Sequence, residues 1–198
     1  MSSRLPLLHP ENMTADQRSL YNRIAAGPRA NGPFRIMHDD ATLAGPFNAL
    51  AHAPLIGDAV QELGSALRFK GKLQDRTREL VICAVAAALN SEYEWYAHSR
   101  AAVVVGVTEE ELTQLKAGTI PQEASDAEKS ALKLTRELIA EAGIPDSTFE
   151  DAQQHLGHEG TVEVTVLVGY YRTLAGLLAV ANVKAPEDQT PEDTTQPE

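Results

Sequence analysis

Residues 79–98 read ELVICAVAAALNSEYEWYAH, and this stretch decides the fold class. The run from Leu80 to Leu89 is apolar on every side of a helical wheel, which is typical of a helix buried all round. Asn90 interrupts the pattern, and Gly106 ends the helical segment that follows it. The sequence therefore predicts a central pair of helices, over about 74–89 and 91–105.

Most other periodic segments also predict helices, and several begin with a Ser/Thr-x-x-Glu/Gln capping box. These boxes start at Thr14, Ser91, Thr108, Ser125 and Ser147. No run shows sustained two-residue alternation with flanking hairpin turns, so a sheet is not expected. The sequence predicts an all-α, single-domain, multi-helix bundle, with further helices over about 14–26, 54–69, 109–117, 126–142, 147–156 and 160–181.

The length and the composition along the chain suggest one domain with two appendages. A chain of 198 residues can bury a sizeable core without disulfides. We expect an N-terminal helical arm over 1–29, the main domain over 30–183 and an acidic tail over 184–198. The tail has no apolar periodicity, so we expect it to be disordered.

Charge and cysteine content exclude several classes of partner. The net charge is −11 and no basic cluster is present, so neither nucleic acid nor membrane is an expected partner. Cys83 is the only cysteine, which rules out an intrachain disulfide and fits a reducing cytosol. The N-terminus lacks a signal-peptide core, and the longest apolar runs span about ten residues, too short for a membrane helix. We therefore expect a soluble, cytoplasmic protein.

Glu94 and His98 are the first candidate catalytic residues. They lie four residues apart on a predicted helix and share its apolar stripe with Ala101 and Val105. A carboxylate one turn from an imidazole can fix its tautomer and raise its basicity. Two structural readings stand beside this one, because Glu94 is also the fourth residue of the Ser91 capping box and His98 could be a core histidine. A metal site would need a third ligand, so no metal is predicted.

Glu79 is the third candidate, at the edge of the apolar run. Partial desolvation there would raise the pKa of its carboxyl and suit it to proton transfer. The alternative is a surface glutamate that pairs with Arg76 or with solvent. Cys83, inside the apolar run, is read as core filling rather than as a reactive thiolate.

Arg172 interrupts the apolar terminal helix beside Tyr171. A buried arginine usually has an anionic partner, either a protein carboxylate or a ligand carboxylate. We assign Arg172, together with Tyr171 and Trp95, to substrate binding, with a structural salt bridge as the alternative for Arg172.

At these residues the sequence resembles the carboxymuconolactone decarboxylase family, within the alkylhydroperoxidase D-like (AhpD-like) superfamily. The resemblance covers about residues 30–183. It rests on Arg78-Glu-Leu-Val-Ile82, on Glu94-Trp-x-x-His98, on Gly106-Val-Thr-Glu-Glu110 and on Glu163 to Arg172. It implies stacked helices that assemble into homotrimers or homohexamers, with sites near subunit interfaces and no cofactor.

The hydroperoxidase branch of that superfamily carries a Cys-x-x-Cys pair, whose positions are occupied here by Ser91 and Glu94. Without the thiol pair a two-cysteine peroxidase cycle cannot run. The resemblance then implies the decarboxylase-like branch, in which Glu and His act on a small molecule without a cofactor.

We therefore expect a cofactor-independent lyase or isomerase, of the carboxy-lyase type, acting on a small carboxylated lactone or a related enolisable acid. His98 would deliver a proton to carbon, Glu94 would orient the imidazole, and Glu79 would be a second acid/base. Two alternatives remain: a peroxide-handling antioxidant protein that has lost its thiol pair, and a non-enzymatic ligand-binding protein.

Overall fold

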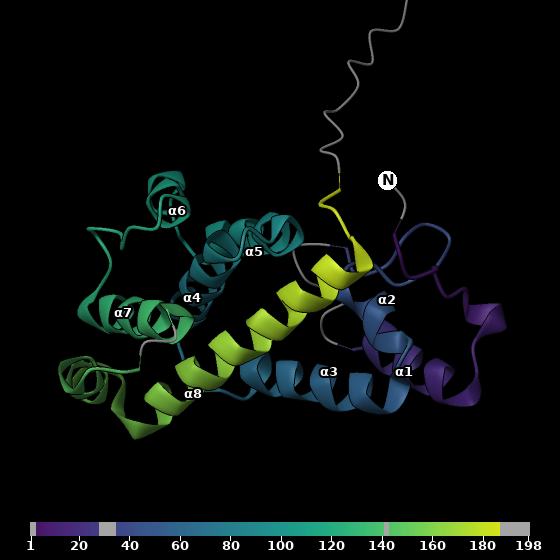
Figure 1. The fold of residues 1–198 in the computed structure, drawn as a ribbon, viewed down its shortest axis with the longest axis horizontal. Coiled ribbons are helices and arrows are strands. Elements are labelled where there is room, and N and C mark those ends of the chain that lie inside the picture. The colour runs from purple at the N-terminus through teal and green to yellow at the C-terminus, as the bar shows by residue number, and fades with distance from the viewer. Residues whose placement is uncertain (1–2, 28–34, 141–142, 187–198) are drawn as a thin grey trace, which may run out of the picture.

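Helices are the regular secondary structure of the described part of the chain, which confirms the predicted all-α class. The computed structural model describes residues 3–27, 35–140 and 143–186, in which no strand forms beyond an isolated bridge between Met37 and Leu43. In chain order the elements are a 3-10 turn at Pro10–Asn12 and α1 (Ala15–Ala25), α2 (Pro46–Ala51), α3 (Pro54–Phe69), α4 (Asp75–Ala88), α5 (Glu92–Val104), α6 (Glu109–Lys116), α7 (Asp126–Ala140) and α8 (Asp146–Ala181) (Figure 1).

The sequence located most helix starts correctly, and capping explains why. Thr14 and Thr108 form reciprocal capping boxes, and Ser125 exchanges the same pair of bonds with Glu128. The prediction at Ser91 is wrong, because its side chain makes no capping bond. The prediction at Ser147 is also wrong, since α8 starts at Asp146 with Pro145 as its N-cap.

Two elements differ from the predicted map. The segments predicted as separate helices over 147–156 and 160–181 are one element, α8, with a kink at Gly157 (φ 68°, ψ 179°). The short helix α2 forms between the helices predicted over 14–26 and 54–69, in a segment where no helix was predicted. Gly45 has a φ of 59°, and a Cβ on it would lie 2.4 Å from the ring of Tyr93. Glycine therefore lets the start of α2 approach α5.

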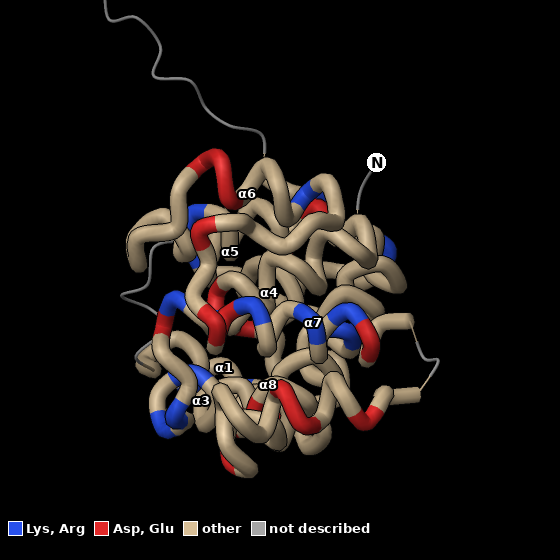
Figure 2. The backbone as a smooth tube through the Cα atoms, turned by 90° about the vertical axis from the view of Figure 1, so that its left-hand side faces the viewer, with Lys and Arg blue, Asp and Glu red and all other residues tan. Residues whose placement is uncertain are grey.

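Helix α4 lies at the centre of the bundle, in contact with α5, α6, α7 and α8 (Figures 1 and 2). It is buried on nearly every side from Thr77 to Ala86, as the apolar run predicted. Its largest core cluster joins Val81, Ile82 and Val85 to residues of α7 and α8. The central position of α4 means that a polar side chain on it must find its partners inside the protein.

The N-terminal helix α1 packs on α2 and α3 through Leu20 and Ile24, which are both buried. The predicted boundary near residue 29 falls in 28–34, outside the described residues. Most of the predicted disordered tail, from residue 187 onward, also lies outside them.

Helix α8 is long and apolar enough to cross a membrane by length and composition alone. Its best 18-residue window has a mean hydropathy of 1.6, and 44% of that window is buried inside the protein. The buried side, which includes Val164, Leu167 and Val168, belongs to the core. A core helix of this kind passes the same hydropathy test as a membrane span.

Candidate active site

Glu79 and His98 meet in the interior between α4 and α5. The carboxylate Oε2 of Glu79 lies 2.7 Å from the imidazole Nδ1 of His98. Glu79 is 1% exposed and His98 4%. A neutral imidazole bonded in this way carries its proton on Nδ1 and donates it to the carboxylate, which leaves Nε2 as the acceptor nitrogen.

A short connection between α4 and α5 produces this contact. The chain reverses within residues 89–91, where Asn90 takes the left-handed conformation with a φ of 51°. Asparagine tolerates that region better than most residues, because its short side chain can bond locally. The reversal brings together two side chains that are 19 residues apart in the sequence.

Glu94 lies on the other side of the imidazole. Its Oε2 is 3.5 Å from Nε2 of His98, and the Glu94 residue is 3% exposed. The pairing expected from the i, i+4 spacing is therefore present, but it is the longer of the two carboxylate contacts. Because Glu94 faces inward, its side chain does not complete a capping box with Ser91.

Two arginines approach the second oxygen of Glu79. Arg68 of α3 places Nη1 3.3 Å from Oε1, and Arg78 of α4 places Nε 4.0 Å from the same atom. Neither contact has the geometry of a hydrogen bond, and Oε1 and the Arg78 Nε are both buried without one. Glu79 is thus held by one hydrogen bond and two nearby positive charges. The predicted alternative of a Glu79–Arg76 pair is not formed, because Arg76 bonds to Glu111 and Glu128.

The two glutamates differ in proton affinity. Burial alone would raise the pKa of Glu79, but its interactions with His98 and then with the two arginines hold that pKa below its usual range. Burial raises the pKa of Glu94 to about 7, with the charge of Glu79 adding to the rise and His98 opposing it. Near neutral pH the site therefore pairs an ionised carboxylate with a carboxyl that can still carry a proton.

Tyr171 of α8 closes one side of the site. Its ring packs edge-on against the imidazole, with ring centroids 4.9 Å apart and planes at 85°. Burial, followed by the charges of Glu79 and Glu94, raises the pKa of its hydroxyl. Tyr171 stays neutral and acts as a wall for the imidazole.

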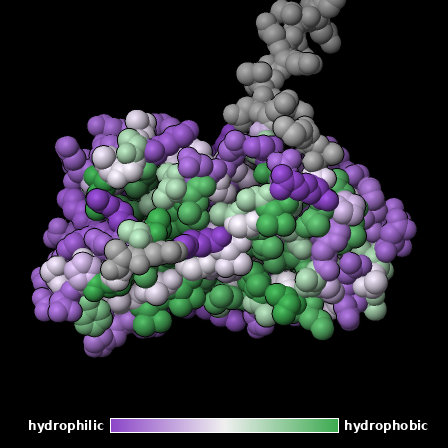
Figure 3. Space-filling view, viewed as in Figure 1, coloured by the Kyte–Doolittle hydropathy of each residue, from purple (hydrophilic) through white to green (hydrophobic). Residues whose placement is uncertain are grey.

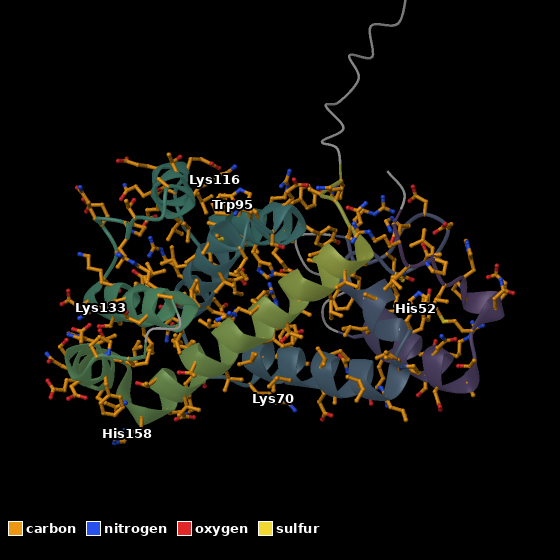
Figure 4. All side chains as sticks on the ribbon, in the orientation of Figure 1. His52, Lys70, Trp95, Lys116, Lys133 and His158 are labelled. Carbon is orange, nitrogen blue, oxygen red and sulfur yellow. The ribbon has the colours of Figure 1, made fainter. Side chains whose placement is uncertain are left out.

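The structure brings together Glu79, Glu94, His98 and Tyr171, but it places Trp95 and Arg172 elsewhere. The ring of Trp95 packs beneath the ammonium of Lys116 at 5.2 Å, in a hollow between α5 and α6 (Figure 4). Arg172 donates to the carbonyl of Leu138 on α7 at 3.2 Å. Consecutive helical residues point about 100° apart, so Trp95 and Arg172 diverge from their neighbours Glu94 and Tyr171.

Cys83 is fully buried, one turn after Glu79 on α4. Burial and then the negative charge of Glu79 raise the pKa of its thiol. The protonated thiol is a weak nucleophile, so Cys83 fits the core-filling role predicted for it. Among the described residues, no group of three or more His, Cys, Asp and Glu side chains is arranged to hold a metal ion.

Sequence reasoning missed Arg68 and Arg78 and ranked Glu94 above Glu79 as the partner of His98. One signal was available for Glu79: a tight reversal at Asn90 sets residues at similar distances on either side of it opposite each other. Glu79 precedes Asn90 by 11 residues and His98 follows it by 8, a difference of less than one turn. No comparable signal exists for Arg68, which a loop separates from α4.

Comparison with known proteins supports one family. Residues 54–137 match the model of the carboxymuconolactone decarboxylase family. No curated protein matches the chain. The match covers α3, α4, α5 and α6 and most of α7, and so includes Arg68, Glu79, Glu94 and His98.

Several solved structures share the fold at low sequence identity. An uncharacterised peroxidase-related protein from Ralstonia eutropha JMP134, with an alkylhydroperoxidase AhpD core, is 16% identical over 94% of each chain, with a TM-score of 0.75. The debrominase Bmp8 is 12% identical, with a TM-score of 0.71 over 93% of this chain and 92% of its own. A protein of unknown function from Agrobacterium tumefaciens, suggested to be an antioxidant defence protein AhpD, is 20% identical, with a TM-score of 0.64 over 72% of this chain and 99% of its own.

At these identities the structural likeness establishes the fold and leaves the chemistry open, since one fold hosts several activities. The structural relatives themselves include both antioxidant-type proteins and a debrominase. The match over residues 54–137 relates this part of the chain to the carboxymuconolactone decarboxylase family, and the fold is one that AhpD-like structures share.

Proposed function

We propose that this protein is a cofactor-independent lyase or isomerase that acts by acid–base chemistry on a small carboxylated lactone or a related enolisable acid. The observation that carries the proposal is the buried imidazole of His98, bonded at Nδ1 to Glu79 (2.7 Å) and facing Glu94 at Nε2 (3.5 Å). Such a site can take up and release a proton near neutral pH without a metal or a redox group.

In the proposed reaction the bond between the substrate carbon and its carboxylate breaks, and CO2 leaves. The electron pair of that bond passes into a dienolate, which must then be protonated on carbon. The proton comes from the His98–Glu94 pair, which a proton from solvent later restores. Glu79 remains ionised and keeps the imidazole in one tautomer. This assigns to Glu79 the orienting role that the sequence suggested for Glu94.

The direct test is the release of CO2 from 4-carboxymuconolactone by the wild type and by His98→Ala, Glu94→Gln and Glu79→Gln. We expect turnover by the wild type and a loss of about 10²–10⁴-fold in each variant, the usual contribution of a general acid or base. Glu92→Gln is the matched control, because Glu92 lies on the same helix but pairs with Lys184 at the surface. Full activity of His98→Ala would contradict the assignment.

A thiol peroxidase is the second candidate, since structural relatives include proteins of the AhpD type. It would require Cys83, the only cysteine in the sequence. The raised pKa of this thiol leaves little thiolate at neutral pH, which opposes the role. Consumption of an alkyl hydroperoxide that is lost in Cys83→Ala would establish the peroxidase instead of the lyase.

We also propose that the protein is a homo-oligomer, a trimer or a hexamer, that associates through α8. The outer side of this helix carries an uncharged seam with heptad spacing: Val162, Val166, Gly169, Thr173, Gly176 and Val180. Val162 and Val180 are 62% and 64% exposed, and a Cβ on Gly169 or Gly176 would meet nothing within 4 Å. Apolar residues also gather on the face along which α8 runs (Figure 3).

Packing within the chain therefore does not require glycine at these two positions of the seam. Close approach of a helix from another copy of the chain would require it. Sedimentation of the wild type should show an oligomer, and Val166→Glu should dissociate it. Val104→Glu is the control, because Val104 is 73% exposed at the end of α5 and lies outside the seam. A wild-type monomer would contradict the proposal.

A further inference from the structure

The side of Glu79 that faces away from the imidazole is unusually rich in positive charge. Arg68 from α3 and Arg78 from α4 both approach the same oxygen, Oε1, at 3.3 and 4.0 Å. Their side chains are 20% and 8% exposed, so solvent screens them only in part. Arg78 already bonds to Asp75 at 2.8 Å, which leaves Arg68 as the cation whose described ion pair is with Glu79 alone.

The two glutamates of the site otherwise have similar surroundings. Both are at least 97% buried, and both contact the same imidazole. The charged groups that act on Glu94 are His98 and Glu79, whereas those that act on Glu79 include the two arginines. The two carboxyls therefore differ in the arginines and in the distance to His98, which is 2.7 Å for Glu79 and 3.5 Å for Glu94.

Every element packed around Glu79 contributes a titratable or charged group to this balance. The groups that face it are Arg68 of α3, Arg78 and Cys83 of α4, His98 and Glu94 of α5, and Tyr171 of α8. On α6 and α7, the carboxylates that approach α4 are Glu111 and Glu128, and Arg76 binds both. Because the Cys83 thiol and the Tyr171 hydroxyl are neutral, the permanent positive charges next to Glu79 are those of Arg68 and Arg78.

We infer that Arg68 is a positioning residue that keeps Glu79 ionised, so that Glu79 orients the imidazole and Glu94 carries the exchangeable proton. Arg68 acts through Glu79 and needs no contact with the substrate. The inference deepens the proposed function, on which it rests for its catalytic meaning. The protonation of the Glu79–His98 pair can be measured without any substrate.

The test is an NMR titration of the histidine side chains in the full-length protein with labelled histidine, with the His98 signal identified by its loss in His98→Gln. The His98 signal reports the uptake of a proton by the Glu79–His98 pair as the pH is lowered. In Arg68→Met and Arg68→Gln the same uptake should move to higher pH by about one to three units, the usual effect of one opposite charge at this distance. Arg68→Lys should restore most of the wild-type position.

Arg68→Gln retains a donor at this position and guards against a failure of Arg68→Met to fold. Arg23→Met is the matched control, because Arg23 also forms an ion pair with α3, at 2.7 Å to Asp58, but does so at the surface. The inference is overturned if the titration does not move in Arg68→Gln, if Arg68→Lys moves as far as Arg68→Gln, or if Arg23→Met has the same effect.

The catalytic consequence distinguishes this inference from the proposed function. If the wild type releases CO2, the acidic limb of its pH–rate profile should move up in Arg68→Gln and return in Arg68→Lys. If no enolisable acid is turned over but the NMR titration still moves, the proposed function fails and the role of Arg68 stands. If turnover occurs and neither readout moves, Arg68 is only structural.

Discussion

Helix α4 carries two clusters, one turn apart, and in each of them two glutamates contact one shared nitrogen-containing side chain. Around Arg76, the guanidinium bonds to Glu111 of α6 and Glu128 of α7. Around Glu79, the base is the imidazole of His98, with Glu94 on its far side. The first cluster is part-exposed at Arg76 (28%), and the second is almost fully enclosed.

The difference between the clusters lies in whether the base can lose its charge. Arg76 is always charged. Against the opposing effect of burial, the bond from the Thr108 backbone and then the bond from Arg76 lower the pKa of Glu111, while the bonds from Arg76 and then Ser125 lower the pKa of Glu128, so both remain ionised. Both glutamates also complete capping boxes, which ties three helices together. The imidazole is titratable, and its two carboxyls have opposite pKa shifts. The permanently charged Arg76 forms a structural ion-pair cluster. The imidazole of His98 can gain or lose a proton, so its cluster can transfer one.

The largest expected contrast is in turnover. Glu79→Gln should reduce CO2 release by about 10²–10⁴-fold, because the amide cannot hold the imidazole in the same charge state. Glu128→Gln should leave the rate within about threefold while lowering stability. Steady-state rates of the two variants check this contrast, and equal losses of rate would show that the clusters are not functionally distinct.

Stability should depend on pH with opposite signs in the two clusters. The raised pKa of Glu94 gives stability that is complete below about pH 4 and is lost as pH rises toward 7, up to about 3 kcal/mol. The lowered pKa values of Glu111 and Glu128 give stability that is present above about pH 4 and is lost on further acidification.

Urea unfolding at pH 5, 6, 7 and 8, compared between wild type and Glu94→Gln, isolates the first of these effects. The variant should lose the decline between pH 5 and 7. A decline that persists unchanged in Glu94→Gln would assign it to another group.

Removing the permanent charge should cost stability but not activity. Arg76→Met leaves two ionised glutamates without their shared partner, and we expect a loss of about 2 kcal/mol of unfolding free energy, reduced by the partial exposure of the arginine. Arg23→Met, at a surface ion pair, should cost less than about 1 kcal/mol. Urea midpoints measure both, and equal losses would mean that the Arg76 cluster is no stronger than a surface pair.

The smallest expected effect separates true caps from apparent ones. Thr108→Ala and Ser125→Ala should each cost about 1 kcal/mol, because both side chains cap a helix. Ser91→Ala should be nearly neutral, since the Ser91 side chain makes no capping bond. Thermal unfolding of the three variants checks the ranking, which fails if Ser91→Ala is the most damaging.

The same three serine and threonine positions show that the Ser/Thr-x-x-Glu pattern alone does not determine whether a capping box forms. Ser91-Glu-Tyr-Glu94 has the letters of a capping box, as do the boxes at Thr108 and Ser125. At Thr108 and Ser125 the box glutamate also bonds to Arg76, which lies close to the cap. At Ser91 the glutamate turns inward to His98 instead. At Ser91 a histidine on the same helix holds the glutamate inward, and the capping box does not form.

The sequence by itself determined the helices and one face of the site, because helix periodicity, capping and the i, i+4 spacing of Glu94 and His98 are local properties of the chain. Only the tertiary structure decided that Glu79 is the closer partner of His98, that Arg68 lies behind Glu79, and that Trp95 and Arg172 point elsewhere. Those outcomes depend on how α3, α4, α5 and α8 pack around one another. Packing is set by the shapes of many side chains at once, so no short stretch of sequence encodes it.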